Sequence, residues 1–432
     1  MVAPARAGRP DGRTSRAGSA ARPLLPSGPV TQTSPTPSIV RPALVYMALF
    51  GAVGAYFPYI GVFFQSIGLS LEVVGLFGAL NSGIALLAAP AWGAVADWVR
   101  DVRGPLVAAG LFSAGAAAIL AVVRDPLAVA LGVCLLAAGA AGLGPMLDSR
   151  TIDIVGENRD RFARARAWGS AAFIVVSLLV GLLIDRTTPA GMFLAYAPLL
   201  VVMSLAAWFL LGGGRRSRRT VGFNPAAGLA QIVQDPRLGP FFLGSVLVWA
   251  TVAAITTFIS IHMAGLGADG TLIGALWAAG ALVEVPLMLL FPSVASRWGA
   301  ERLIVVGALA FAARGAAFAL AGQPAVLVAV APLGGVGFAF FYVGTVTYVA
   351  RTAPREIAAT AQGIFSGTAF SLGSILGAVI AGQLAGVLTL PALFATSALG
   401  TLVAAGVVWW SFGRRVTRGG PPATGPHAHT AR

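Results

Sequence analysis

The chain of 432 residues contains no lysine, one cysteine and three histidines, and only 10% of its residues are charged. A single cysteine excludes a disulfide framework, and Cys134 lies in an apolar run without the second ligand that a thiolate metal site needs. Because lysine is absent, any fixed cation inside the molecule must be an arginine. We therefore expect neither a metal site nor a bound cofactor.

What the chain has in abundance is apolar sequence. Hydrophobic residues make up 57% of it and the mean hydropathy is +0.85, whereas an ordinary soluble domain is about one quarter charged. This composition indicates a polytopic protein whose main partner is the lipid bilayer. The net charge of +14 comes from arginines dispersed between apolar runs and not gathered on one soluble domain, so it predicts membrane topology and no nucleic-acid partner.

Twelve apolar runs follow an N-terminal segment, 1–42, that is rich in Arg, Pro, Ser and Gly. This segment lacks the apolar core of a signal peptide, and its composition predicts a disordered tail. Each later run is a candidate transmembrane helix. The predicted spans are 43–67, 73–96, 105–123, 127–147, 168–184, 192–211, 240–263, 273–294, 303–321, 325–350, 358–384 and 391–412.

The arginines predict one orientation. With the N-terminal tail in the cytoplasm, nearly all arginine-rich loops fall on the cytoplasmic side, which predicts an inner-membrane protein with both termini cytoplasmic. The connection 212–239 contains NPAAGLAQIVQ, typical of a short amphipathic helix on the inner surface. It separates two expected six-helix bundles, 43–211 and 240–412, and a cytoplasmic tail follows at 413–432. We expect a monomer.

A weak internal repeat supports this division. GLSLEVVGLFGAL at 68–80 and GLGADGTLIGALWA at 265–278 each lead into the second span of their half. Paired repeats are common in carriers with a midplane site, although a duplicated channel would show the same spacing. Small residues at 137–144 and four glycines of the eleventh span predict close helix packing. These glycines are Gly363, Gly367, Gly373 and Gly377.

One acid lies deep in an apolar run. The sequence 272–292, LIGALWAAGALVEVPLMLLFP, is long enough to cross a bilayer and carries Glu284 near its middle. At that position the acid is about half-way through a hydrocarbon core ~30 Å thick. An acid at such depth costs about 2.5 to 3.5 kcal/mol, so it either faces a wet cavity as a functional group or is neutralised by a contact between helices. Trp277 lies on the same helical face and would line the same cavity.

A second concentration of polar residues lies at 145–173. Asp148 ends the fourth predicted span and Arg166 opens the fifth. An acid and a guanidinium at neighbouring antiparallel helix ends can pair, which lowers the cost of each near lipid. Alternatively both residues belong to a solvated cytoplasmic turn, the interpretation that we prefer for Arg159, Arg161 and Arg164.

These residues carry a family resemblance. FARARAWGSAAF at 162–173 resembles the start of the fifth helix of the lactose permease, and PMLD at 145–148 matches the position of its fourth-helix glutamate. Across most of 42–412 the chain is similar to the lactose, nucleoside and phenylpropionate permease branch of the major facilitator superfamily. GALWAAGALVEV with Glu284 and AARGAA with Arg314 resemble the phenylpropionate and nucleoside branches in particular. The resemblance implies an all-α fold of twelve transmembrane helices in two pseudo-symmetric bundles.

The resemblance also implies site residues. Asp148 and Arg166 would form the charge pair on the N-terminal side of the substrate cavity, and Phe173 would take the place of a sugar-stacking tryptophan. The histidine and glutamate of the tenth helix of the lactose permease correspond here to Gly334 and Gly337, and the lysine of its eleventh helix to Phe370. The proton relay of that permease is therefore absent, and a lactose-type substrate is not expected.

We predict a secondary transporter, not an enzyme, that moves an aromatic acid, nucleoside or sugar-like solute by alternating access in symport with protons. Glu284, assisted by Arg314, is the predicted coupling site, and Asp148 is the second candidate. Arg166 would bind a substrate carboxylate or hydroxyl. Further predicted contacts to the solute are Tyr56, Tyr59, Phe173, Trp277, Asn81 and Gln362.

Three alternatives remain at this point. An intramembrane enzyme would need clustered catalytic groups, but His262 lies near a helix end with no obvious acid beside it. Proton-driven efflux of amphiphilic compounds would use the same architecture as uptake. A membrane sensor that has lost transport would also keep the twelve spans, and an uptake assay would separate it from a carrier.

Overall fold

The computed structural model describes residues 38–156, 159–213, 225–353 and 358–413, and the regular structure of these residues is helical throughout. Within these described ranges, twelve segments are long and apolar enough to cross a membrane, which confirms the predicted number. They are Val40–Ser66, Leu71–Val99, Arg103–Val122, Pro126–Val155, Asp160–Arg186, Pro189–Leu210, Leu238–Gly265, Gly270–Trp298, Ala300–Leu320, Pro324–Thr352, Ala361–Ala385 and Leu390–Gly413.

Eight spans contain one long helix each. These helices are α3 (Leu71–Val99), α4 (Arg103–Val122), α7 (Arg159–Arg186), α8 (Met192–Leu210, preceded by η1, Pro189–Gly191), α10 (Leu238–Gly265), α11 (Gly270–Trp298), α12 (Ala300–Leu320) and α17 (Leu390–Gly413). The predicted surface helix is also present as α9 (Pro225–Gln234). Residues 214–224 of the arginine-rich connection lie outside the described residues.

The other four spans are divided into shorter helices. The first span breaks near Pro58, the fourth near Gly142 and the tenth directly before Pro332. Proline interrupts the hydrogen bonds of a helix and glycine loosens its backbone. The eleventh contains a π-helical segment, η2 (Ile364–Ala369), a feature often found at functional sites. The resulting pieces are α1 (Val40–Tyr56), α2 (Ile60–Ser66), α5 (Pro126–Ala140), α6 (Leu143–Val155), α13 (Pro324–Val330), α14 (Pro332–Thr352), α15 (Ala358–Gly363) and α16 (Phe370–Ala385).

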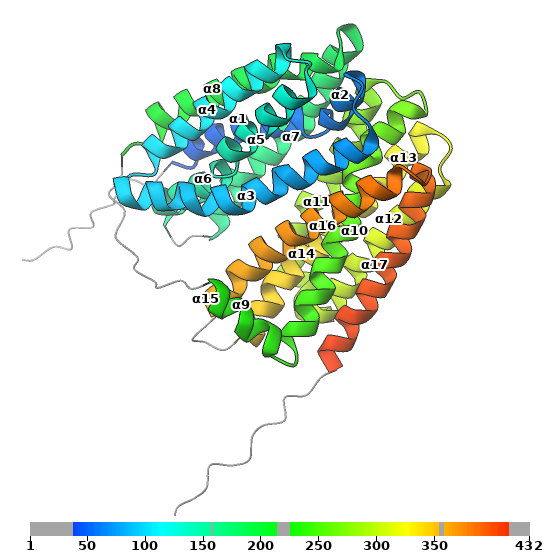
Figure 1. Ribbon diagram of the computed structural model, residues 1–432. Helices are drawn as coiled ribbons and strands as arrows, with labels where there is room; N and C mark the ends of the chain where they lie inside the picture. Colours follow the sequence, from blue (N-terminus) through cyan, green and yellow to red (C-terminus); the bar gives the residue numbers. More distant parts are fainter. Residues whose placement is uncertain (1–37, 157–158, 214–224, 354–357, 414–432) are drawn as a thin grey trace, which may run out of the picture. The chain divides into compact units, whose positions relative to one another are not determined.

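The spans form two halves that meet along two pairs of helices (Figure 1). Helices α1 to α8 make up the first half and α10 to α17 the second. Within the first half α1 packs on α7 and α8, and within the second α12 packs on α14 and α17. Between the halves, α3 packs on α16 and α7 packs on α11.

The two halves approach most closely at one end, where glycines remove the side chains between helices. A Cβ atom added at Gly75 of α3 would lie 2.6 Å from the carbonyl oxygen of Ala378 on α16, and one added at Gly274 of α11 would lie 2.5 Å from that of Ser177 on α7. Both glycines follow their N-cap residues, Ser70 and Asp269, by five positions. The internal repeat therefore places equivalent glycines at equivalent crossings. We call this region the closed end.

A carboxylate also ties the halves together at the closed end. Asp185, near the end of α7, accepts hydrogen bonds from the backbone N–H groups of Gly270 (2.5 Å) and Thr271 (3.1 Å), and from the Thr271 hydroxyl (2.6 Å). These N–H groups open α11 and have no acceptor within their own helix. An anion at this position also interacts favourably with the helix dipole. Asp185 thus caps a helix of the other half.

Asp185→Asn should loosen the closed end. A carboxamide offers one acceptor oxygen and no charge, so the helix start loses part of its cap, worth about 0.3–1 kcal/mol for an exposed group. We expect backbone amides at 268–274 to exchange hydrogen about two- to fivefold faster, as measured by mass spectrometry. Asp125→Asn is the matched control, since Asp125 caps α5 within one half. Equal exchange at 268–274 in the variant and the wild type would contradict a capping role.

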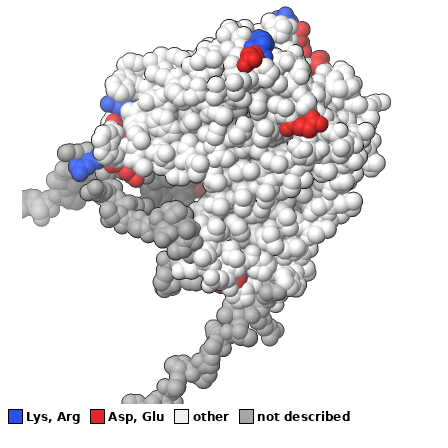
Figure 2. Space-filling view, in the orientation of Figure 1, with Lys and Arg blue, Asp and Glu red and all other residues white. Residues whose placement is uncertain are grey.

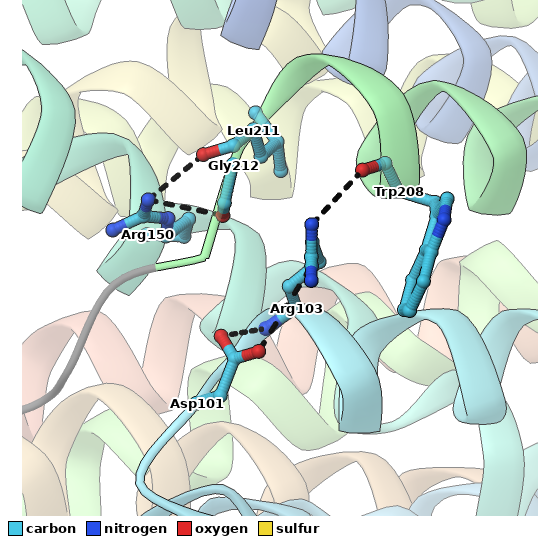
Figure 3. A network of polar contacts seen from close by, with 6 residues as sticks. All are labelled: Asp101, Arg103, Arg150, Trp208, Leu211 and Gly212. Carbon is cyan, nitrogen blue, oxygen red and sulfur yellow. Dashed lines mark hydrogen bonds and ion pairs between the residues drawn. The ribbon is translucent and has the colours of Figure 1, made fainter.

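At the opposite end, arginines fasten α8 within the first half (Figure 3). Arg103 lies over the Trp208 ring, 4.2 Å from its centroid, and donates to the Trp208 carbonyl. Arg150 donates to the carbonyls of Leu211 (2.8 Å) and Gly212 (3.1 Å). Cations are favourable at a helix carboxyl end because the last carbonyls lack helical donors. The first half is thereby held together at this end.

The predicted packing glycines behave in two ways. Gly373 and Gly377 confirm the prediction, because a Cβ on either would collide with α10. For Gly363 and Gly367 the prediction is wrong, since a Cβ at these positions would meet no atom of the described residues within 4 Å. These two glycines lie in α15 and η2, outside the part of the span, α16, that packs closely against α10.

The surface is that of a membrane protein. Figure 2 shows a face that is mostly uncharged, with charged side chains along its upper and left margins, an acidic group within its upper right part and a hollow between the two halves. Many large apolar side chains are exposed on the long helices, among them Leu87 and Phe209. Exposed apolar area of this extent is stable in lipid and not in water.

Candidate functional site: a central cavity between the halves

A cavity of about 520 Å³ lies between the two halves, next to the closed end. This volume is in the range of sites for small organic ligands. Both halves contribute to its wall, through α1, α2, α3, α5 and α7 on one side and α10, α11, α12, α14 and α16 on the other. A solute bound here would contact both halves at once.

Glu284 is the one acid among the residues that line the cavity, all of which the structure describes. It lies on α11 two residues before Pro286, whose missing N–H leaves the carbonyl of Leu282 without its helical donor. The backbone of α11 at Glu284 packs against Gly335 of α14. Within the described part of the chain, the Glu284 carboxyl has neither an ion-pair nor a hydrogen-bond partner. The alternative that a helix contact neutralises it finds no support.

Arg314 is the one cation among the same lining residues. It projects from α12 into space left free by Gly334 of α14, where a Cβ would lie 2.5 Å from Nη1. The guanidinium carbon lies 5.4 Å from the centroid of the Phe311 ring and 5.7 Å from that of Phe318. Its Nε and Nη2 atoms are buried without a hydrogen-bond partner, and no ion pair with Glu284 is present in the described residues.

Four of the predicted solute contacts line the cavity: Phe173, Trp277, Asn81 and Tyr56. The Trp277 indole donates to the Ser260 hydroxyl (3.0 Å), which fixes the ring across the cavity wall. Its ring packs edge-on against Phe57 of the first half, with centroids 4.8 Å apart. Tyr56 is stacked on Tyr196, also at 4.8 Å.

Tyr59 and Gln362 are not among the lining residues. Tyr59 follows the break between α1 and α2, and its side chain is fully buried. Its hydroxyl donates to the Ser177 carbonyl and is 3.3 Å from that of Gly270, so it joins the closed end. Gln362 lies on α15, beyond the cavity.

The predicted pair of Asp148 and Arg166 is present, with Nη1 and Oδ1 3.2 Å apart. The Tyr46 hydroxyl also donates to the same carboxylate at 2.6 Å, and the Arg166 guanidinium lies 5.1 Å from the ring centroid of Phe50, which lines the cavity. Neither charged residue lines the cavity itself. With 42% and 35% of their side chains exposed, Arg166 and Asp148 lie beside it.

The helix ends around this pair differ from the prediction. Helix α6 continues to Val155, seven residues past Asp148, and α7 already begins at Arg159, because the charged residues at 159–166 sustain a helix. Arg161 and Arg164 therefore lie on α7, and the prediction of a solvated turn is wrong for them. Arg159 begins the same helix.

The glycines that replace the lactose-permease relay have a structural consequence. The absence of a side chain at Gly334 makes room for Arg314, and a Cβ at Gly337 would lie 2.6 Å from the Phe311 ring. Phe370 lines the cavity instead of a charged residue. The Arg314 guanidinium and the Phe311 ring thus fill the space beside these two glycines.

Sequence reasoning missed an aromatic cluster on the second half, which we call the Trp249 cluster. It consists of Trp249, Phe311, Phe338 and Phe370, all of which line the cavity. The ring of Trp249 lies 4.9 to 6.1 Å from the three others, in tilted or edge-on contacts. Aromatic residues are common in membrane spans, and these four come from four helices, so no sequence pattern joins them.

Two six-helix halves around a central cavity are an architecture common in secondary transporters. The family and relatives given next are transporters, which excludes the enzyme alternative that the sequence had left open. The sequence matches the model of the MFS_1 like family over residues 39–395, and the chain belongs to this family. It is therefore a multi-pass membrane transporter of the major facilitator superfamily, as the resemblance had implied.

Related proteins transport different solutes. The chain is 27% identical over 349 residues to the maltose permease of Geobacillus stearothermophilus, covering 79% of this chain and 86% of the permease. It is 28% identical over 153 residues to a probable 3-phenylpropionic acid transporter of Escherichia coli, covering 34% and 39%. The crystal structure of the nucleoside transporter NupG superimposes with a TM-score of 0.78 at 18% identity, covering 87% and 99%, which shows the shared fold.

Proposed function

We propose that this protein is a secondary active transporter that carries a small organic solute through the central cavity by alternating access, in symport with protons. The observation that carries the proposal is Glu284, an acid in a cavity between two halves that forms neither an ion pair nor a hydrogen bond through its carboxyl group with any described residue. The related permeases named above support a solute of the aromatic-acid, nucleoside or sugar class.

The geometry suggests how coupling works. When charged, Glu284 would need water or a cation beside it, and closing the cavity would remove both at a cost of several kcal/mol. When protonated, it is neutral, and the halves can rock past the midplane. The cavity, which is open at the end opposite the closed end, would then close there and open at the closed end instead. Protonation of Glu284 is thereby required for the carrier to change from one open conformation to the other.

Glu284→Gln should uncouple the carrier. The amide imitates the protonated acid permanently, so exchange of solute across the membrane should continue. Accumulation driven by a pH gradient should fall to the equilibrium level, because the amide has no proton to release. Counterflow and gradient-driven uptake in proteoliposomes measure the two activities separately.

Glu301→Gln is the matched control, because Glu301 lies in the first turn of α12 and does not line the cavity. Misfolding of Glu284→Gln would remove counterflow as well as accumulation. If Glu284→Gln accumulated solute against its gradient as well as wild type does, Glu284 would be a structural acid. Coupling would then have to be sought at Asp148.

The direction of transport is part of the same test. The arginine distribution supports cytoplasmic termini in an inner membrane, so inverted vesicles expose the cytoplasmic side. Solute uptake into right-side-out vesicles supports symport. Proton-driven accumulation in inverted vesicles would instead support efflux of amphiphilic compounds, to which the aromatic wall of the cavity is also suited.

A further inference from the structure

We infer that Arg314 anchors a carboxylate of the transported solute and that the Trp249 cluster receives an aromatic or apolar body attached to it. The substrate class is then an organic monocarboxylate and not a neutral sugar or nucleoside. This inference rests on the proposed transport function and narrows its substrate.

The first argument is the uncompensated charge. A guanidinium with buried nitrogens needs a counter-ion or acceptors, because a partly desolvated charge without a partner is costly. The described residues offer Arg314 no ion pair, and two of its nitrogens have no acceptor. A carboxylate fits the planar fork of a guanidinium with two parallel hydrogen bonds. A solute anion would supply the negative charge and the hydrogen-bond acceptors that the described protein residues do not offer to Arg314.

The second argument is the surroundings of the charge. Phe311 belongs to the Trp249 cluster and also lies beside the Arg314 guanidinium, 5.4 Å from ring centroid to carbon. A solute with its carboxylate on Arg314 therefore has aromatic rings within reach of its body. The lining is mostly apolar and aromatic, and its neutral polar side chains are mainly serine and threonine hydroxyls, with Asn81 as the one side-chain amide. Such a wall suits an aromatic body better than a sugar or nucleoside, which needs many hydrogen bonds.

The third argument is that the second half makes room for this cation. Gly334 leaves the space that Nη1 occupies, and an added Cβ would lie 2.5 Å from that atom and 3.1 Å from Cδ. Alanine at 334 would therefore push the guanidinium away without changing its charge. This gives a variant that perturbs the position of Arg314 and leaves its chemistry intact.

Binding to the purified full-length protein tests the inference. The probes are phenylacetate, 3-phenylpropionate and 4-phenylbutyrate, their uncharged amides, maltose and uridine. We expect at least one carboxylate to bind more tightly than its amide by about 10- to 100-fold, the size of charge-assisted hydrogen bonds. Arg314→Gln should remove this preference, and Arg314→Lys should keep part of it. Gly334→Ala should weaken carboxylate binding, whereas Gly406→Ala, where a Cβ meets no atom within 4 Å, should not.

Stability separates an anchoring role from a structural one. If Arg314 serves the solute, the unliganded Arg314→Gln protein should melt close to wild type, because the contacts with the Phe311 and Phe318 rings are weakened but no hydrogen bond or ion pair of the described residues is lost. If Arg314 serves only as the counter-charge of Glu284, Arg314→Gln would leave the preference for carboxylate over amide unchanged, which would overturn the inference. Arg302→Lys, exposed on the same helix, is the control.

Absence of binding by every carboxylate would also overturn the inference. Proton-driven uptake of maltose or uridine in that case would leave the proposed transport function intact. Conversely, carboxylate binding that depends on Arg314, without gradient-driven uptake, would support the anchor and contradict the coupling.

Discussion

Gly75→Val should reduce transport about 5- to 150-fold while the protein still folds and inserts. At the closed end a Cβ at Gly75 would lie 2.6 Å from the Ala378 carbonyl oxygen and 2.6 Å from the Gly382 Cα on α16. These are backbone atoms, which cannot move aside without separating the helices. Overpacking of this kind costs about 1–3 kcal/mol, which changes the ratio of two conformations by about 5- to 150-fold. The carrier should therefore stay open at this end.

Counterflow in proteoliposomes and labelling of a single cysteine measure the two consequences. In a Cys134→Ser background, Phe57→Cys places a thiol in the cavity wall next to the closed end. We expect Gly75→Val to increase its labelling by an impermeant maleimide added at that end and to reduce counterflow. Gly93→Val is the control, because it changes a glycine of the same helix where a Cβ meets no atom within 4 Å. Normal counterflow in Gly75→Val would show that closure of α3 on α16 is not required for transport.

Loss of Arg166 should have the second large effect. Arg166→Ala leaves the Asp148 carboxylate with the Tyr46 hydroxyl as its remaining partner, next to the cavity. Since both charged side chains are more than a third exposed, the loss of folding stability should be modest, about 1 kcal/mol or less. Solute affinity should fall severely, because the pair orders α6 and α7 beside Phe50 of the cavity wall.

The exchanged pair, Asp148→Arg with Arg166→Asp, separates folding from binding. It restores opposite charges across the same two helices but turns the guanidinium toward Tyr46. We expect normal insertion and thermal stability without recovery of transport. Arg164→Ala, an exposed arginine two residues earlier on α7, should bind solute like wild type. Wild-type affinity in Arg166→Ala would show that the pair has no role in solute binding.

The sequence by itself determined the number of spans and the presence of an isolated acid and arginine in the second half. Apolar runs of membrane length and the distribution of arginines are properties of local composition, and local composition decides which segments insert into the bilayer and in which orientation. The same local reasoning paired Asp148 with Arg166, and the 3.2 Å contact confirms the pair, although neither residue lies at a helix end. It misjudged the start of α7, since polarity alone does not mark where a helix begins.

The tertiary structure alone decided which of these residues share the cavity. Tyr56 and Tyr59 are three residues apart in the sequence, yet the break near Pro58 turns Tyr59 toward α7 and α11 while Tyr56 lines the cavity. The partner of Asp185 lies 85 residues away, at Gly270. The space for Arg314 is created by a glycine on another helix. Contacts of this kind depend on how helices from distant parts of the chain pack. The apolar pattern of a helix shows which face is buried, but it does not determine which helix packs against that face or which side chains lie there.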